Sequence, residues 1–298
     1  MGKYLKRKEK EMINNKMNKV QEFYNETPFP DYELSRFENK DSLKNHAKLF
    51  PNILDRSIKN DASIIDVGTG TGQLSAFLSL ERTEVYGIDF SDSSLNKAKA
   101  LKEKLDLNSL TLLKIDITNP DEIKIIDKQF DYLLCLGVLH HTGNAYQSFK
   151  NILPLLKSGG FIAIGLYNRY GRIPLKIRKV LARTIFKNNQ KVKDNYIKIQ
   201  IGDVADKERA RGWWNDQYNH PHETTHTIGQ VLKWFKENNI EYIETLPSSS
   251  FKDKPIEFCG VWNKSIYPYL PLRFYHQLTW ISKTNNEGGY WITFGRKK

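Results

Sequence analysis

The sequence predicts an α/β fold, in which a mostly parallel β-sheet carries helices on both faces. Two observations point to this fold. Between residues 63 and 168, short apolar runs alternate with segments of helical pattern, which is typical of parallel strands joined by helices. A glycine-rich turn follows the first of these runs, at a place where α/β folds commonly bind ligands. A chain of 298 residues, 39% of them hydrophobic, is long enough for one large domain with appended segments.

Residues 1–45 are expected to form an N-terminal arm and cap. Residues 1–20 contain seven Lys and Arg against two Glu, so this part is expected to be a charged arm, helical or frayed. The stretch "VQEFYNETPFPDYELSRFE" that follows contains five aromatic residues, and Pro28 and Pro30 prevent one continuous helix through it. We expect this stretch to pack on the core as an aromatic cap.

Residues 46–168 are expected to form the ligand-binding part of the sheet. The apolar runs are continuous instead of alternating, which favours strands that are buried on both faces. Serine and aspartate at the start of one helical segment provide the cap that a helix N-terminus needs. The expected strands are 63–68, 84–90, 110–117, 130–139 and 159–167, and the expected helices are 73–80, 91–105 and 145–156.

The alternation of strands and helices stops after Tyr167 for about 60 residues. An insertion of this length in a compact sheet is usually a lid or a substrate subdomain, so residues 169–227 are expected to form one. A helix at 227–240 and strands at 241–247 and 289–297 then complete the core, in its C-terminal part at 228–298.

The glycine-rich turn "IIDVGTGTGQL" carries an acid that helps to identify the ligand. Gly68, Gly70 and Gly72, with Thr69 among them, allow a ligand to approach the backbone closely, but their spacing differs from G-x-G-x-x-G. Asp66, two residues before the first glycine, would repel a phosphate. S-adenosylmethionine (SAM) has no phosphate and carries a sulfonium and an ammonium group, which a carboxylate attracts. The turn therefore predicts SAM as the cofactor.

Two more aspartates follow the next strands of the predicted sheet. Asp89, followed by Phe90, ends the second strand, where a carboxylate can accept hydrogen bonds from both ribose hydroxyls of an adenosine. Asp116 ends the third strand and is expected to meet the adenine amino group, while Ile117 covers a face of the ring. Three acids at the ends of consecutive strands predict a complete site for an adenosine ligand.

The ordered motifs "DVGTGTGQL", "GIDFS", "LKIDI", "LCLGVLHHT" and "LLKSGGFIAIGLYN" resemble class I SAM-dependent methyltransferases over residues 63–168. The resemblance implies a Rossmann-like sheet of seven strands, the last of them antiparallel, with SAM across the ends of strands one to four. It also implies roles for single residues. Asp66, Gly68 and Gly70 would face the methionine moiety, Asp89 the ribose, Asp116 and Ile117 the adenine, and Leu136 and Gly137 the methionine side. "FYNETPFPDY" is similar to the N-terminal cap of some of these enzymes, so that Tyr24 would close over the cofactor.

Candidate catalytic residues follow the fourth strand. His140 and His141 would lie beside the methyl donor, and a histidine there can take a proton from a hydroxyl acceptor. The acceptor pocket is expected at the end of the fifth strand and in the insertion, lined by Tyr167, Asn168, Trp214, Asp216, Tyr218 and His220. Alternatively, Trp213 and Trp214 would only form the core of the insertion.

No metal site is expected from the sequence. His222 and His226 are four residues apart, as in some metal-binding helices, but the threonines around them fit better as a cap for the helix that follows. Cys135 and Cys259 have neither metal-ligand spacing nor a disulfide pattern, so we expect a cytoplasmic protein. Neither a signal peptide nor an apolar stretch of membrane-spanning length is present in the sequence.

The formal net charge of +12 is unevenly distributed. Residues 169–193 contain nine Lys and Arg and no acid, and 172–190 have the pattern of a cationic amphipathic helix, with Ile173, Ile177 and Val180 at helical spacing. This helix would lie on a membrane surface, bind a polyanion such as a nucleic acid, or simply pack on its own protein.

Taken together, these patterns predict a methyltransferase that acts on an O, N or C nucleophile of a small molecule. An RNA or protein methyltransferase that uses the basic clusters is the first alternative. A SAM-binding module without catalysis is the second, although an intact glycine turn and three aspartates disfavour it.

Overall fold

A computed structural model describes residues 15–185, 190–201, 207–249, 261–263, 266–282 and 289–298. Its centre is one seven-stranded sheet with the strand order β3-β2-β1-β4-β5-β7-β6. The strands are β1 (Ile64–Val67), β2 (Val85–Asp89), β3 (Leu110–Lys114), β4 (Phe130–Leu136), β5 (Leu156–Tyr167), β6 (Ile240–Leu246) and β7 (Tyr290–Lys297).

The first five strands are parallel and the last is antiparallel, as the sequence predicts. Ile64 pairs with Val85 of β2 and with Tyr132 of β4, so the short β1 lies in the middle of the sheet. β7 is inserted between β5 and β6 and runs antiparallel to both. The reversal of strand order at β1 and β4 opens a crevice at the carboxyl ends of the strands, where ligands bind in sheets of this kind.

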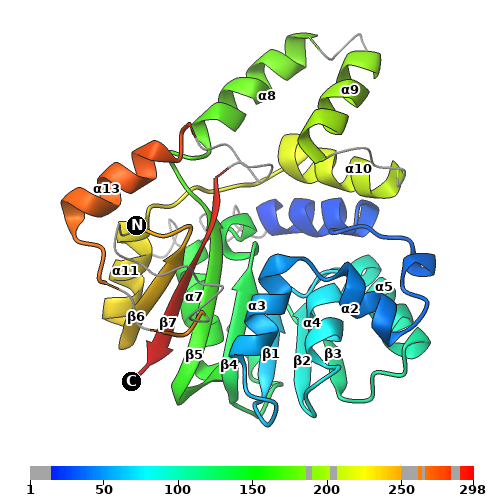
Figure 1. Cartoon of the computed structure of the whole chain (residues 1–298), viewed down its shortest axis with the longest axis vertical. Coiled ribbons are helices and arrows are strands. Elements are labelled where there is room, and N and C mark those ends of the chain that lie inside the picture. The colour runs from blue at the N-terminus through cyan, green and yellow to red at the C-terminus, as the bar shows by residue number, and fades with distance from the viewer. Residues whose placement is uncertain (1–14, 186–189, 202–206, 250–260, 264–265, 283–288) are drawn as a thin grey trace, which may run out of the picture.

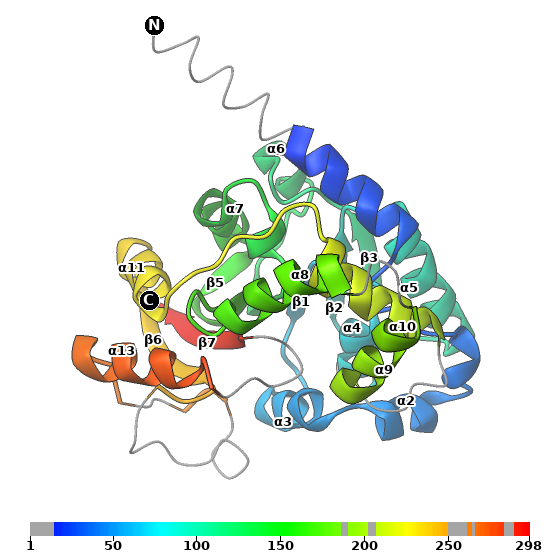
Figure 2. The same cartoon turned by 90° about the horizontal axis from the view of Figure 1, so that it is seen from above.

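Two apolar cores lie between the sheet and the helices that cover it. Figures 1 and 2 show helices on both faces of the sheet. One core joins the sheet to α6 (Pro120–Ile123), α7 (Ala145–Ile152) and α11 (Ile228–Glu237). The other joins it to α2 (Lys40–His46), α3 (Leu49–Ser57), α4 (Gln73–Leu78) and α5 (Asp92–Lys104).

The predicted helix caps are confirmed. Ser91 caps α5 by accepting a hydrogen bond from the backbone N–H of Ser94. Thr227 forms a capping box with Gln230 at the start of α11. Helices 15–26, α8 (Ile173–Ile185), α9 (Gln190–Ile201) and α10 (Lys207–Trp214) lie above the edge where the parallel strands end (Figure 1). A further helix, α13 (Leu270–Thr279), lies beside the sheet.

Several predicted boundaries are wrong, among them the end of the fourth strand, which is Leu136 and not Leu139. The third strand ends at Lys114, so Asp116 lies in the loop two residues beyond it. The predicted helix 145–156 ends earlier, because Pro154 is part of a short 3-10 helix, Leu153–Leu155, and β5 already begins at Leu156. Residues 1–14 of the predicted arm and Cys259 lie outside the described residues.

Candidate functional site

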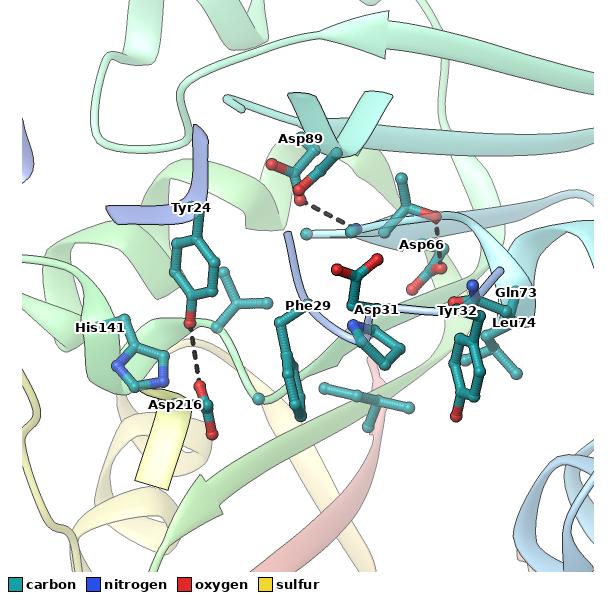
Figure 3. Close-up of a pocket in the computed structure, with 18 of the residues that line it drawn as sticks. Tyr24, Phe29, Asp31, Tyr32, Asp66, Gln73, Leu74, Asp89, His141 and Asp216 are labelled. Carbon is teal, nitrogen blue, oxygen red and sulfur yellow. Dashed lines mark hydrogen bonds between the residues drawn. The ribbon is translucent and has the colours of Figure 1, made fainter. Parts of the chain in front are cut away.

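A cavity of about 800 Å³ lies at the carboxyl ends of the strands, in the crevice described above. Figure 3 shows part of its wall, with Asp66 and Asp89 on the sheet side and Tyr24 and Phe29 on the cap side. Most of the residues that the sequence assigns to the cofactor line this cavity. They are Tyr24, Asp66, Gly68, Thr69, Gly70, Asp89, Phe90, Asp116, Ile117, Leu136 and Gly137.

The glycine turn holds the N-terminal cap as well as facing the cavity. Gly70 has a φ of +55°, and a Cβ atom there would lie 2.4 Å from the backbone oxygen of Phe29. The hydroxyl of Thr71 donates to the backbone oxygen of Pro30 at 2.5 Å. The turn therefore needs glycine at position 70 because the cap packs directly against its backbone.

Gly70→Ala is expected to destabilise the protein more than Gly137→Ala does. Both glycines have positive φ, so each alanine costs about 1 kcal/mol in backbone strain. At Gly137 the new Cβ meets only a ring carbon of Tyr290 at 4.0 Å, whereas at Gly70 it clashes with the Phe29 carbonyl, which adds about 1–3 kcal/mol. Urea denaturation of both variants measures the difference in the free energy of unfolding. Equal losses of this free energy would show that the cap does not pack tightly against the turn.

Asp66 is a buried carboxylate beside this turn. The Thr69 hydroxyl donates to its Oδ2 at 2.8 Å, and within the described residues no cationic side chain forms an ion pair with it. Burial raises the pKa of Asp66 to about 7, and the charge of nearby Asp89 adds to the rise. A buried acid in this state is stabilised as a carboxylate by any cation that enters the cavity.

Asp89 closes the other side of the turn. Its Oδ2 accepts a hydrogen bond from the backbone N–H of Gly70 at 2.9 Å, and its Oδ1 accepts one from Ser91 at 2.9 Å. Burial raises its pKa, and these backbone hydrogen bonds oppose the rise. Asp116 also faces the cavity, where its Oδ1 accepts from the backbone N–H and the hydroxyl of Thr118, both at 2.8 Å.

Helix 15–26 covers the cavity with one stripe of its surface. Met17, Val20 and Tyr24, at spacings of three and four residues, line the cavity. The side chain of Gln21 donates to the backbone oxygen of Phe90 at 2.9 Å, and Asn25 accepts from the Ser91 hydroxyl at 2.9 Å. These bonds attach the cap to the end of β2, next to Asp89.

A polar cluster around Asp216 lies at the end of β5, opposite the glycine turn. Asp216 is in a π-helical turn, Asn215–Asn219, and accepts hydrogen bonds from the hydroxyls of Tyr24 at 3.3 Å and Tyr167 at 3.4 Å. The side-chain amide of Gln217 donates to Asp216 at 2.8 Å and to the Tyr167 hydroxyl at 2.9 Å. Burial and the charge of Asp216 raise the pKa of both tyrosines, which therefore stay protonated and act as donors.

His141 lies in the cavity wall beside this cluster (Figure 3). Its Nδ1 is 3.0 Å from the backbone oxygen of His222. Because a carbonyl oxygen only accepts, Nδ1 carries the proton and Nε2 of the neutral ring carries the lone pair. Burial lowers the pKa of His141, so the ring is neutral at pH 7 and Nε2 can accept a proton.

His140 lies behind His141 and does not line the cavity. Its ring centre is 4.1 Å from that of His141 and 4.3 Å from that of Tyr167, and both of its ring nitrogens are buried without a hydrogen-bond partner among the described residues. Burial lowers its pKa well below the ordinary value, so it is a neutral packing residue in this structure. The pair predicted from the sequence thus divides into one residue at the cavity and one in the wall behind it.

Arg172 is a buried cation that supports the polar cluster from outside the cavity. Its guanidinium carbon lies 3.5 Å from the centre of the Tyr167 ring, and its Nη1 donates to Gln217 at 2.7 Å. Its Nε and Nη2 donate to the two carboxylate oxygens of Glu223. Paired in this way, Arg172 fixes the π-helical turn that carries Asp216.

Five other predicted site residues lie away from the cavity. Gly72 is the N-cap of α4 and faces Ala98, and Asn168 uses its side chain to hold the next turn and Gln277. The His220 ring packs against that of His141, with ring centres 3.7 Å apart. Trp214 and Tyr218 stack at 4.2 Å within the core of the insertion, as in the alternative given above for the tryptophans.

Several cavity residues were not predicted from the sequence. Phe29, Asp31 and Gln217 line the cavity, and Arg172 supports it. The prolines around Phe29 mark a bend in the cap, but they do not show which side chain turns inward. No acid lies near Arg172 in the sequence, because its partner Glu223 comes from 51 residues further along the chain.

Two further expectations concern metals and membranes. Across the described ranges, no group of three or more His, Cys, Asp and Glu side chains is arranged to hold a metal ion. The helices in those ranges are all too short or too polar to cross a membrane. Cys135 lies buried in β4, as its apolar surroundings in the sequence indicate.

Comparisons with known proteins agree with this geometry. A family model described as a methyltransferase domain matches residues 58–239. The ubiquinone biosynthesis O-methyltransferase of Coxiella burnetii (strain RSA 493 / Nine Mile phase I) is 32% identical over 107 residues, which are 36% of this chain and 44% of that protein. The enzyme of the same name from Rickettsia prowazekii (strain Madrid E) is 33% identical over 119 residues, 38% of this chain and 44% of that protein. The chain thus matches less than half the length of these curated relatives.

Two solved structures share the fold at low identity. PKMT2 from Rickettsia typhi in complex with AdoHcy superposes with a TM-score of 0.58 and 14% identity, over 83% of this chain and 52% of that one. The plantazolicin methyltransferase BpumL in complex with SAH gives a TM-score of 0.50 and 15% identity, over 97% and 99%. The family match, the seven-stranded sheet and the acidic glycine turn show that the chain belongs to the methyltransferase-domain family, among the class I SAM-dependent methyltransferases.

Proposed function

We propose that this protein transfers a methyl group from SAM to a small-molecule acceptor that has an apolar body. The observation that carries the proposal is the two-part lining of the cavity. One part holds the buried acids and the glycine turn, and the other is apolar. Asp216 and His141 line the same cavity.

The residues of the first part fit SAM. Asp66 offers a buried carboxylate to the cationic methionine end, and Gly68 and Gly70 leave room for a ligand beside the backbone. Asp89, which lines the cavity, would accept hydrogen bonds from the ribose hydroxyls, and Asp116 and Ile117 would contact the adenine. When bound, SAM supplies a methyl carbon that its sulfonium sulfur makes electrophilic.

The second part of the cavity suggests the kind of acceptor. Apolar side chains from the cap, α2, α3, α4 and the last two strands line it, and these surfaces favour an aromatic or aliphatic molecule. Helix 15–26 and the insertion cover the strand ends from above (Figure 2), which favours a small molecule over a folded RNA or protein. The lining residues include Tyr32, Phe37, Leu43, Phe50, Leu74, Phe77, Leu246 and Ile292.

His141 is the proposed general base for a hydroxyl acceptor. Its Nε2 lone pair is available because Nδ1 is held by the His222 carbonyl. Asp216 is placed to orient a polar group of the acceptor, since Tyr24 and Tyr167 already fix the position of its carboxylate. The aromatic cap excludes water, and the in-line arrangement of acceptor and methyl group supplies most of the acceleration.

Incubation of a cell extract with the protein and methyl-labelled SAM tests the proposal. We expect mass spectrometry to find the label in organic-soluble molecules of low mass, and not in RNA or protein. Asp89→Ala serves as the control, because loss of the ribose contacts is expected to abolish labelling while the acceptor-binding part stays intact. Labelling confined to tRNA or to polypeptides would overturn the small-molecule proposal.

A further inference from the structure

Helix α13 exposes several large apolar side chains, while Gln277 of the same helix is buried. Its residue Gln277 is only 3% exposed, and the Oε1 of Gln277 accepts hydrogen bonds from the side chain of Asn168 and the backbone N–H of Ile228, both at 2.9 Å. Leu270, Phe274 and Leu278, spaced four residues apart on the same helix, are 65%, 48% and 37% exposed. A helix of a soluble domain normally buries its apolar stripe, so this face is built to contact something else.

A second apolar stripe lies on α8. Ile177 and Val180 are 56% and 65% exposed, and Ile173 extends the stripe by one turn. Tyr170, in the turn before α8, contacts Phe274 of α13 edge to face, with ring centres 5.8 Å apart. In Figure 1 both helices lie on the upper, outer side of the molecule. Ten of the fourteen exposed large apolar side chains in the described residues fall within 173–180 and 266–278.

The two helices come from segments without a single acidic residue. Residues 169–193 and 258–286 contain no Asp or Glu, in a chain with 34 of them. Arg169 and Lys176 are exposed next to the apolar stripes, and Arg273 is on α13 itself. The surface therefore combines exposed aliphatic and aromatic side chains with positive charge.

We propose that this surface, formed by α8 and α13, docks the protein onto an anionic lipid bilayer. Leucine, isoleucine and phenylalanine would enter the boundary between headgroups and acyl chains, while the flanking cations would face the lipid phosphates. A second copy of the chain is a poorer fit, because a symmetric contact would bring the same cations together across the interface. A bilayer with acidic headgroups supplies both an apolar phase and the opposite charge.

The docked surface is continuous with the wall of the cavity. Gln277 of α13 holds Asn168, which follows the cavity residue Tyr167 in the chain, and α8 begins with the turn that Asn168 stabilises. Docking would therefore place the end of β5 close to the bilayer. The docking proposal does not depend on the nature of the acceptor, and its test measures binding without turnover.

Vesicle co-sedimentation of the full chain tests the proposal. We expect binding to vesicles of phosphatidylglycerol and phosphatidylcholine, weak binding to phosphatidylcholine alone, and weaker binding as salt is added. The double variant Ile177→Glu/Phe274→Glu is expected to bind the anionic vesicles at least tenfold more weakly. The matched control is Leu49→Glu/Ile125→Glu, which changes two residues that are 64% and 67% exposed elsewhere on the protein, and it is expected to retain binding.

Three results would overturn the proposal. The first is an equal loss of vesicle binding in both double variants, because net charge alone would then explain it. The second is a dimer in light scattering that Ile177→Glu/Phe274→Glu dissociates, which would assign the surface to a second copy. The third is that the protein binds tRNA and not vesicles, and that Ile177→Glu/Phe274→Glu abolishes the tRNA binding. Circular dichroism of both variants checks folding, and all four substituted positions are on the surface.

Discussion

Asp66→Asn is expected to abolish SAM binding and to stabilise the ligand-free protein at pH 8. The folded protein holds the pKa of Asp66 at about 7, above the unfolded value near 4, so ionisation of this buried group costs stability. Because its folded pKa is raised, this cost is absent below pH 4, grows between pH 4 and 7, and stays constant above pH 7. Asparagine removes the charge, and the free energy of unfolding should rise by about 2–4 kcal/mol at pH 8 and hardly change at pH 4. Urea denaturation at the two pH values measures both.

The same carboxyl group predicts the pH dependence of SAM binding. A bound cation lowers the pKa of Asp66, so binding releases a proton wherever the free protein holds Asp66 protonated. The affinity is therefore expected to fall up to about tenfold for each pH unit below 7 and to level off above it. Calorimetry of the wild-type protein between pH 5.5 and 8 measures this slope. A flat affinity over this range would show that Asp66 does not face the cationic end of the cofactor.

The sheet and its helices could be predicted from the sequence because each element has its own local signal. The strands of the core are continuous apolar runs, and caps such as Ser91 and Thr227 lie directly before their helices. The predicted ends of elements are wrong where a single local feature overrides the periodic pattern of apolar residues. Pro154 changes the end of a helix into a 3-10 turn, and the strand pairing of Lys114 with Asp89 ends β3 earlier than its apolar residues suggest.

The two halves of the site differ in how far the sequence predicts them. The cofactor half depends on residues within one turn or at strand ends, so motif spacing places Asp66 and Asp89 correctly in the cavity. The acceptor half depends on contacts between distant segments. Tyr24 meets Asp216 across 192 positions of the chain, and Arg172 meets Gln217 across 45. The spacing of residues in the sequence does not predict such pairs. Trp214 was predicted to line the pocket because it is aromatic, but it is part of the insertion core.

His141→Gln is expected to slow methyl transfer about 10²- to 10⁴-fold, the usual contribution of a general base, with little change in SAM affinity. His141 lies in the cavity wall with the Nε2 lone pair available, whereas Asp66 and Asp89 hold the cofactor. Because burial lowers its pKa, the acid limb of kcat in the wild-type protein should lie below pH 6.5, and the variant should lose it. Single-turnover assays with the identified acceptor over pH 5 to 9 measure both the rate of methyl transfer and the acid limb of its pH profile.

His140→Phe is the matched control for this experiment. The His140 ring is fully buried against His141 and Tyr167, and its two nitrogens lack partners among the described residues. Phenylalanine fills a similar volume without a buried polar atom to satisfy, so turnover should stay within a few fold of the wild type. A rate loss in His140→Phe as large as that in His141→Gln would assign both rings to one packing role. Full activity in His141→Gln would mean that the acceptor reaches the cavity already deprotonated, and that positioning alone drives the transfer.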